Sequence, residues 1–220
     1  MAKYLSFNPK NYEIIYNGVD IDYFKPGSVA ESRHQRESMG IEANDKVVLL
    51  VATMRREKGH TTAIEALNIL HAKFAGKEKI HLVFVGNGDN TYMAELENLV
   101  KKYSLEAYVH FEGNQKDVRK YHEIADVFTL TSTCETFSIA ALEAMSYGLP
   151  LSLTDTGGAS EMIIHGKNGM LSKPGHADSI AASWAFLLDA RLDKKAIREI
   201  VLENYTLEQM FEKYEKAIMH

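Results

Sequence analysis

Cysteine and clustered metal ligands are scarce in this sequence, and positive charge is not in excess. The single cysteine, Cys134, excludes an internal disulfide and the usual multi-cysteine zinc and iron–sulfur sites. Nine histidines include no pair closer than ten residues, so no helical His-x3-His metal site is expected. Lys and Arg number 25 against 30 for Asp and Glu, and the net charge of −5 gives no general attraction for nucleic acid.

Long apolar runs and prolines are also few. The longest apolar run, around residues 47–54, is too short to span a bilayer, and the N-terminal sequence MAKYLSFNPKNYE lacks the apolar core of a signal peptide. The four prolines are scattered rather than gathered in a linker, and 45% hydrophobic residues are enough for one full core. We therefore expect one domain, without a membrane-spanning segment, in a reducing, cytoplasmic compartment.

Short apolar runs bounded by Gly, Asn or Asp predict strands, and a helical pattern follows most of them. The runs are residues 14–16, 47–52, 80–85, 109–111, 127–130 and 151–153. Continuous runs such as VVLLVA and HLVFVG are typical of parallel strands buried on both faces. After Asp178 the pattern is helical only, and the last stripe, Leu207, Met210, Tyr214 and Ala217, needs a surface to cover. The predicted class is α/β, with a doubly wound, Rossmann-like parallel sheet.

In such sheets ligands bind outside the carboxyl ends of the strands, so the loops there are candidate sites. One loop places Arg55, Arg56 and Lys58 just before a helix start, where a phosphate would bind well; a solvated charged turn is the alternative. The next loop, GNGDNT, starts like a dinucleotide fingerprint, but Thr91 occupies the position of the third small residue and excludes a nicotinamide site. The glycine pair Gly157-Gly158 predicts a tight turn.

The stretch TSTCETFSIAALEAM combines a polar, acidic entry with a nearly all-apolar helix that should be buried. Glu143 lies in that helix, where an ionised carboxylate is costly unless a ligand hydroxyl pair or a buried cation compensates it, or unless it reaches solvent. The backbone N–H groups of Phe137, Ser138 and Ile139 form a candidate phosphate seat at the helix start. Glu135 lies eight positions before Glu143, roughly 12 Å along a helix axis, so the two carboxylates should hold different parts of an elongated ligand.

Together these motifs resemble the retaining, nucleotide-sugar-dependent glycosyltransferases of family four, which have the two-domain GT-B fold. The family's Glu-x7-Glu motif is Glu135 to Glu143, followed by AMSYGLP and then by Gly157-Gly158 with Glu161. The sequences NGVD, EKG and HGKNG match further family motifs in the same order. The resemblance runs from residue 12 to the C-terminus, which leaves residues 1–11 as an extension or an interdomain remnant.

The resemblance implies that this chain is the C-terminal, donor-binding half of a GT-B enzyme. Glu135 would contact the donor sugar, Lys58 would neutralise the diphosphate, and Glu143 would hold the ribose hydroxyls. The backbone of Gly113, Asn114 and Gln115 would meet the base, and the amides of Phe137, Ser138 and Ile139 the distal phosphate. The implied reaction transfers a sugar, with retained configuration, to a glycan or lipid-linked acceptor, as in polysaccharide biosynthesis. It needs no metal and no cofactor beside the nucleotide-sugar donor.

Two departures from the family pattern matter. Thr53 stands where the family usually has an arginine, so one phosphate cation is missing, and Arg55 or Arg56 is our hypothesis for its replacement. The acceptor half is also absent; either it was removed or it is a separate polypeptide, and the start at Met1 just upstream of the domain favours removal. We therefore expect this chain alone to be inactive. We expect the full-length protein to be cytoplasmic, and peripheral binding to the inner face of the membrane stays open.

Two other functions stay open at this level. One is half of a nucleotide-sugar epimerase, which would use the same kind of cleft, although the Glu-x7-Glu motif favours a transferase. The other is a non-catalytic nucleotide- or partner-binding module in which Glu143 is structural. The base, the sugar, the acceptor and the oligomeric state do not follow from the sequence.

Overall fold

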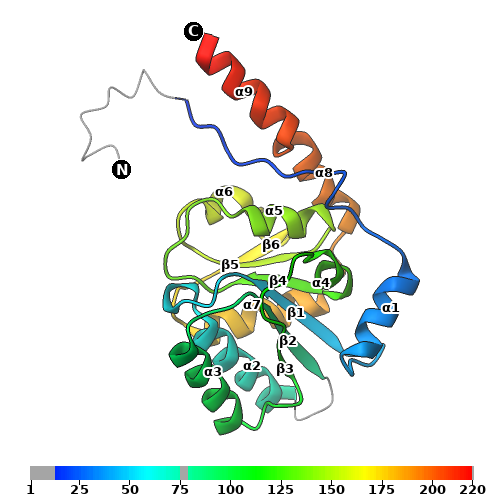
Figure 1. Ribbon diagram of the computed structural model, residues 1–220, viewed down its shortest axis with the longest axis vertical. Coiled ribbons are helices and arrows are strands. Elements are labelled where there is room, and N and C mark those ends of the chain that lie inside the picture. Colours follow the sequence, from blue (N-terminus) through cyan, green and yellow to red (C-terminus); the bar gives the residue numbers. More distant parts are fainter. Residues whose placement is uncertain (1–12, 75–78, 220) are drawn as a thin grey trace, which may run out of the picture.

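The computed structural model describes residues 13–74 and 79–219, so the predicted extension at residues 1–11 lies outside the described residues. One six-stranded parallel sheet forms the centre, with the strand order β3-β2-β1-β4-β5-β6 (Figure 1). The strands are β1 (Lys46–Val51), β2 (Ile80–Val85), β3 (Val109–Phe111), β4 (Val127–Leu130), β5 (Leu151–Thr154) and β6 (Gly169–Ser172). This order confirms the doubly wound, Rossmann-like class, and the strand order reverses between β1 and β4.

Helices cover both faces of the sheet. In chain order they are α1 (Val29–Ser38), the 3-10 turn η1 (Arg56–Lys58), α2 (His60–Phe74), α3 (Asn90–Lys102), α4 (Arg119–Ile124), α5 (Ile139–Ser146), α6 (Ala159–Met162), α7 (Ala177–Asp189), α8 (Lys194–Asn204) and α9 (Leu207–Met219). Helices α2, α3 and α7 share one apolar core, and α4, α5 and α8 share the other (Figure 1). Among the described residues, no helix is both long enough and apolar enough to cross a membrane.

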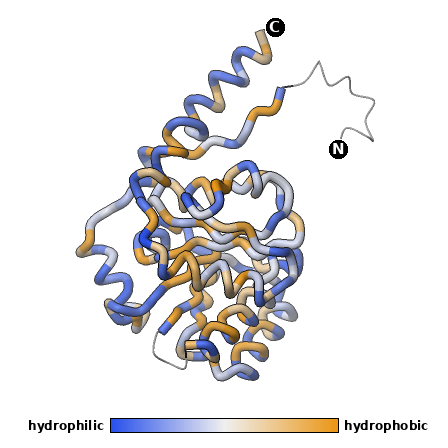
Figure 2. The backbone as a smooth tube through the Cα atoms, turned by 180° about the vertical axis from the view of Figure 1, so that it is seen from behind, coloured by the Kyte–Doolittle hydropathy of each residue, from blue (hydrophilic) through white to orange (hydrophobic). Residues whose placement is uncertain are grey.

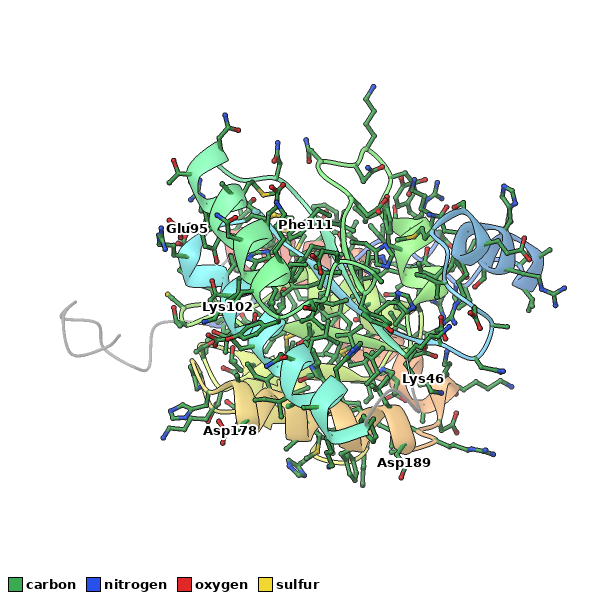
Figure 3. All side chains as sticks on the ribbon, turned by 90° about the horizontal axis from the view of Figure 1, so that it is seen from below. Lys46, Glu95, Lys102, Phe111, Asp178 and Asp189 are labelled. Atoms are coloured by element: carbon green, nitrogen blue, oxygen red, sulfur yellow. The ribbon has the colours of Figure 1, made fainter. Side chains whose placement is uncertain are left out.

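The central strand shows how the sequence builds these two cores. Val47 and Leu49 point into the core of α5, whereas Val48 and Leu50 point into the core of α2, because successive side chains of a strand alternate between faces. All four are fully buried. Hydrophobic residues accordingly gather along the strands and the helix faces against them (Figure 2), and side chains fill the space between the layers when seen from below (Figure 3).

Five of the six predicted strands are present, and one prediction is wrong. Residues 14–16 do not enter the sheet; β6, which the sequence analysis missed, pairs with β5 as the sixth strand. The N-terminal segment instead passes the junction of α8 and α9, where Val19 N–H donates to the carbonyl of Tyr205 at 2.9 Å. Gly18 allows this approach, since a Cβ there would lie 2.5 Å from the carbonyl oxygen of Thr206.

The apolar stripe predicted on the last helix covers the described chain only at its start, where Leu207 and Met210 are partly buried and the Gly18 N–H donates to Met210 Sδ at 3.2 Å. Helix α9 extends away from the sheet (Figure 1), and none of its residues is buried. Further along the stripe, Tyr214 is 47% exposed and Ala217 is exposed, and the neighbouring Phe211 and Ile218 are 57% and 82% exposed. The stripe exists as predicted, but beyond Met210 no described residue covers it.

Candidate functional site

The loops after β1 and β4 meet where the strand order reverses. The hydroxyl of Thr131 donates to the carbonyl of Gly59 at 2.9 Å, and Thr133 N–H donates to the carbonyl of Glu57 at 2.8 Å. Gly59 has a φ of +70°, and a Cβ there would lie 2.1 Å from the Thr131 carbonyl oxygen. Only glycine therefore lets the two loops approach so closely.

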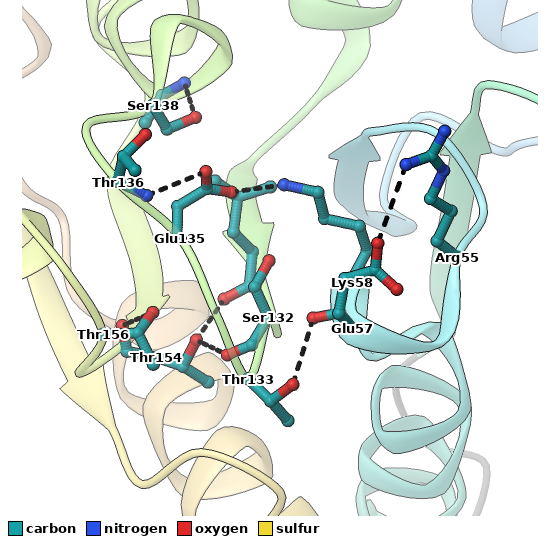
Figure 4. Close-up of polar contacts among 12 residues, drawn as sticks. Arg55, Glu57, Lys58, Ser132, Thr133, Glu135, Thr136, Ser138, Thr154 and Thr156 are labelled. Atoms are coloured by element: carbon teal, nitrogen blue, oxygen red, sulfur yellow. Dashed lines mark hydrogen bonds and ion pairs between the residues drawn. The ribbon is translucent and has the colours of Figure 1, made fainter.

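Lys58 and Glu135, to which the family resemblance gives roles toward the diphosphate and the donor sugar, face each other across these loops (Figure 4). Lys58 Nζ lies 2.8 Å from Glu135 Oε2, and the two side chains are 25% and 19% exposed. The other carboxylate oxygen of Glu135 accepts a hydrogen bond from the N–H of Thr136 at 3.2 Å. A charge-assisted pair that is mostly shielded from water is a strong interaction, and both side chains still keep some contact with solvent.

The two neighbouring arginines have different surroundings. Arg56 pairs with Glu95 of α3 at 2.6 Å, and its guanidinium lies over the ring of Tyr92 at 5.2 Å. Arg55 is 69% exposed and lies 4.0 Å from Glu57 (Figure 4). Of the two candidates for the missing family arginine, Arg55 is therefore the one that is less engaged by other residues.

The candidate phosphate seat lies just before α5. The helix begins at Ile139 rather than near Phe137 as predicted, because Ser138 is the N-cap and its hydroxyl accepts from the N–H of Ala141 at 3.2 Å. Within the described chain, the N–H groups of Phe137, Ser138 and Ile139 donate no hydrogen bond. Since Glu135 lies in the loop before the helix, the estimate of 12 Å along a helix axis does not apply to its separation from Glu143.

The glycine pair in the loop after β5 packs against the backbone that precedes the candidate phosphate seat. Gly157 has a φ of +54°, and a Cβ there would lie 2.0 Å from the carbonyl oxygen of Glu135. The next residue, Gly158, donates its N–H to the carbonyl of Thr136 at 2.6 Å. The predicted tight turn is present, and its second role is to let the β5 loop pack against the backbone around Glu135 and Thr136.

Glu143 lies on α5 and is partly buried. Burial raises the pKa of its carboxyl group to about 7, and among the described residues no cation or hydrogen-bond donor pairs with it. The buried ion pair that the sequence left open is therefore absent from this part of the chain. A desolvated carboxylate without a partner is a strong acceptor for ligand hydroxyls, and a perturbed pKa of this kind is typical of functional sites.

A cleft of about 350 Å³ lies next to the β1 loop, and two of the three residues predicted to meet a base, Asn114 and Gln115, line it, whereas Gly113 does not. Its lining includes Thr53, Gly86, Asn87, Asn114 and Gln115. The carbonyl of Gly113 accepts from the N–H of Gly86 at 2.8 Å, which ties the β2 and β3 loops together. A larger cleft, about 790 Å³, includes Lys46 at the amino end of β1, so it lies at the opposite end of that strand.

Sequence reasoning gave no role to several residues that hold the site together. Thr131 and Thr133 fasten the two loops, and the side chain of Asn17 donates to the carbonyl of Phe137 at 2.9 Å. In the sequence, only the membership of Asn17 in the NGVD motif pointed to a function for this residue. In the described ranges, no group of three or more His, Cys, Asp or Glu side chains is arranged to hold a metal ion.

Known proteins share both the sequence and this architecture. Residues 31–202 match the family described as glycosyl transferases group 1. An uncharacterised glycosyltransferase of Methanocaldococcus jannaschii is 32% identical over 205 residues, which are 92% of this chain and 50% of that protein. The crystal structure of Anabaena HepE in complex with UDP and glucose is 25% identical with a TM-score of 0.85, and the match covers 94% of this chain and 56% of HepE.

The chain also resembles a domain whose structure was solved on its own. The C-terminal domain of a group 1 glycosyl transferase, LpcC of Francisella tularensis, is 25% identical with a TM-score of 0.67, over 90% of this chain and 98% of that domain. This chain spans about half the length of the curated relatives that it matches. Its fold is that of one half of a GT-B glycosyltransferase. The match over residues 31–202 confirms the resemblance read from the motifs, and the chain belongs to the glycosyl transferases group 1 family.

Proposed function

We propose that this chain is the donor-binding half of a retaining glycosyltransferase, and that it holds a nucleoside diphosphate sugar across the β1 and β4 loops. The Lys58–Glu135 ion pair at 2.8 Å carries this proposal. It combines a cation suited to a diphosphate and a carboxylate suited to sugar hydroxyls at the point where doubly wound sheets bind ligands.

The donor would lie across the site in the order base, ribose, diphosphate and sugar. The base would enter the cleft at Asn114 and Gln115, and the ribose hydroxyls would donate to the carboxylate of Glu143, which no described residue contacts through a hydrogen bond or an ion pair. The diphosphate would lie between Lys58 and the amides before α5 that donate to no described residue, where the helix dipole adds positive potential. The sugar would then reach Glu135, and Arg55 would supplement Lys58 in place of the family arginine.

The proposed reaction transfers a glycosyl group to a glycan or lipid-linked acceptor. The bond between the anomeric carbon and the phosphate oxygen breaks, and the anomeric carbon bonds to an acceptor hydroxyl oxygen with its configuration retained. The proton of that hydroxyl passes to the departing diphosphate oxygen, so the products are the glycosylated acceptor and the nucleoside diphosphate. Lys58 and the amides of Phe137 to Ile139 would stabilise the negative charge that develops on the departing diphosphate. Neither a protein nucleophile nor a metal is required by this scheme.

Metal-free binding of a nucleoside diphosphate tests the proposed site. UDP, GDP and ADP are titrated calorimetrically into the chain in buffer containing EDTA, beginning with UDP because HepE was crystallised with it. We expect weak binding of at least one diphosphate, unchanged by EDTA, because Lys58 and the helix start supply the positive potential. A requirement for magnesium or manganese would contradict this phosphate site, and no binding of any of the three would contradict the proposed function.

The acceptor would be held by a second half that this chain does not contain. The exposed apolar residues of α9, including Phe211 and Ile218, are consistent with a surface that such a half would cover. A cytoplasmic location, with the membrane face as a peripheral site for the whole enzyme, is part of the same proposal.

We expect the 220-residue chain alone to show no appreciable sugar transfer, because positioning the donor against the acceptor supplies much of the barrier reduction. The measurement is release of diphosphate from UDP-glucose with and without a mixture of glycan acceptors. Turnover that depends on an added acceptor would contradict the assignment of this chain as an incomplete enzyme.

A further inference from the structure

The N-terminal segment touches the loop that carries the candidate phosphate seat. Asn17 Nδ2 donates to the carbonyl oxygen of Phe137 at 2.9 Å, across 120 positions of the sequence. The ring of Tyr16 lies 4.7 Å from the ring of Phe137, which also lies 5.4 Å from the ring of Tyr205. Both the backbone and the side chain of Phe137 are thus fixed by residues outside its own loop.

The hydrogen bond from Asn17 determines where a neighbouring N–H points. The carbonyl of Phe137 and the N–H of Ser138 belong to one peptide unit, and the described chain contains no cis peptide bond. In a trans peptide the C=O and the N–H point in opposite directions. Holding the carbonyl toward Asn17 therefore directs the N–H of Ser138 away from it.

The preceding peptide unit is held in the same way. Gly158 N–H donates to the carbonyl of Thr136 at 2.6 Å, so the N–H of Phe137 points away from Gly158. Two successive amides therefore have fixed directions and no partner within the described chain. One of the two anchors is a backbone group, but the other is the side chain of Asn17, which a substitution removes cleanly.

We propose that Asn17 is a positioning residue for the distal phosphate of the donor. It holds the peptide between Phe137 and Ser138 so that an N–H, rather than a carbonyl oxygen, faces the anion. This inference rests on the proposed function, because it takes the seat before α5 as the place of the phosphate. Without Asn17 the peptide rotates more freely, and the amide loses its preset direction.

The test compares UDP with uridine in the Asn17→Ala variant, or the matching guanosine or adenosine pair if the screen selects that base. We expect the diphosphate to weaken by roughly fivefold, the effect of losing one net hydrogen bond, and the nucleoside to stay within about twofold. Asn204→Ala is the matched control, because the Asn204 side chain also donates to a backbone carbonyl, that of Ile200 at 2.9 Å on α8. That control should leave both affinities unchanged.

A second variant and a direct readout protect the test from a folding defect. Asn17→Asp keeps the shape of the side chain without its donor and should weaken the diphosphate at least as much as Asn17→Ala. In the unmodified 15N-labelled chain, UDP should shift the amide resonances of Phe137 and Ser138. Variants that fold and bind the diphosphate normally, with both resonances still shifted by UDP, would overturn the role of Asn17 while the proposed function survives. Unshifted resonances would overturn both the role of Asn17 and the phosphate site before α5. Equal losses of diphosphate and nucleoside would also overturn the role of Asn17.

Discussion

Replacing Lys58 by alanine is expected to weaken a nucleoside diphosphate by more than tenfold, while the corresponding nucleoside stays within about twofold. A hydrogen bond to a charged group contributes roughly 1.5 to 3 kcal/mol, and that contribution is lost. The substitution also leaves Glu135, which is only 19% exposed, without its cation and next to the phosphates. The unpaired carboxylate then repels the ligand and adds to the loss. Calorimetric titration of UDP and uridine, or of the base selected by the screen, measures both affinities.

Two further variants separate these contributions. The double variant Lys58→Ala/Glu135→Gln should recover part of the diphosphate affinity. The glutamine no longer repels the phosphates, but the cation that attracted them is still absent. Lys79→Ala is the matched control, because Lys79 forms an ion pair with Glu42 at 2.6 Å outside the candidate site. This control should leave the affinities for the diphosphate and the nucleoside unchanged. Equal losses of diphosphate and nucleoside in Lys58→Ala would place Lys58 away from the phosphates.

The two glutamates of the Glu-x7-Glu motif are expected to differ in what they bind. Glu143→Gln should weaken both the diphosphate and the sugar nucleotide by roughly tenfold or more, because the ribose is present in both ligands. Glu135→Gln should weaken the sugar nucleotide and spare the diphosphate, because only the donor carries the sugar. Each variant is titrated with both ligands after its folding is checked by thermal melting. Equal losses of diphosphate affinity in two folded variants would contradict the order of ribose and sugar.

The raised pKa of Glu143 provides an independent readout of the same assignment. Burial shifts this pKa to about 7, so the ionised fraction rises from roughly a tenth at pH 6 to roughly nine tenths at pH 8. Ribose hydroxyls donate best to the ionised form, and uridine affinity should therefore rise up to roughly tenfold over this range, whereas Glu143→Gln should show no such rise. Uridine avoids the titration of the phosphates, and an identical rise in the variant would contradict the role of Glu143.

The pH dependence of stability has the opposite sign. The folded-state pKa of Glu143 lies above its ordinary value of 4.5, so this group's stabilising contribution is fully present below pH 4.5 and is lost as the pH rises through about 7. Glu143→Gln should therefore melt at the same or a higher temperature than the unmodified chain at pH 8. The comparison also separates a binding role from a structural one, since a purely structural carboxylate would lower the melting temperature when replaced.

The sequence predicted the sheet well because buried parallel strands leave continuous apolar runs. Residues 47–52 and 80–85 correspond to β1 and β2 within one residue at either end. The strand β6 was missed because only Met170 and Leu171 are large apolar residues in it, and it directly follows a glycine-rich turn. Residues 14–16 are equally apolar, but Ile14 is 60% exposed and the ring of Tyr16 lies 6.0 Å from the ring of Tyr205 between α8 and α9, a contact that no local pattern reveals.

The candidate site was predicted in its parts but not in its connections. Lys58 and Glu135 were both identified from their motifs, yet their contact spans 77 positions and depends on β1 and β4 being neighbours. Arg56 looked as suitable as Arg55, because its partner Glu95 lies on a different helix. That no described residue pairs with Glu143 is likewise a property of the packed structure, since a sequence cannot exclude a distant cation.

A crystal structure of the chain with the diphosphate selected by the screen tests the central claim most directly. The account predicts a phosphate oxygen within hydrogen-bonding distance of Lys58 Nζ and of the Ser138 N–H, with the ribose hydroxyls on Glu143. The account would be contradicted by nucleotide density at another place while the β1 and β4 loops bind nothing. The cleft of about 790 Å³ beside α1 and Lys46 is one such place.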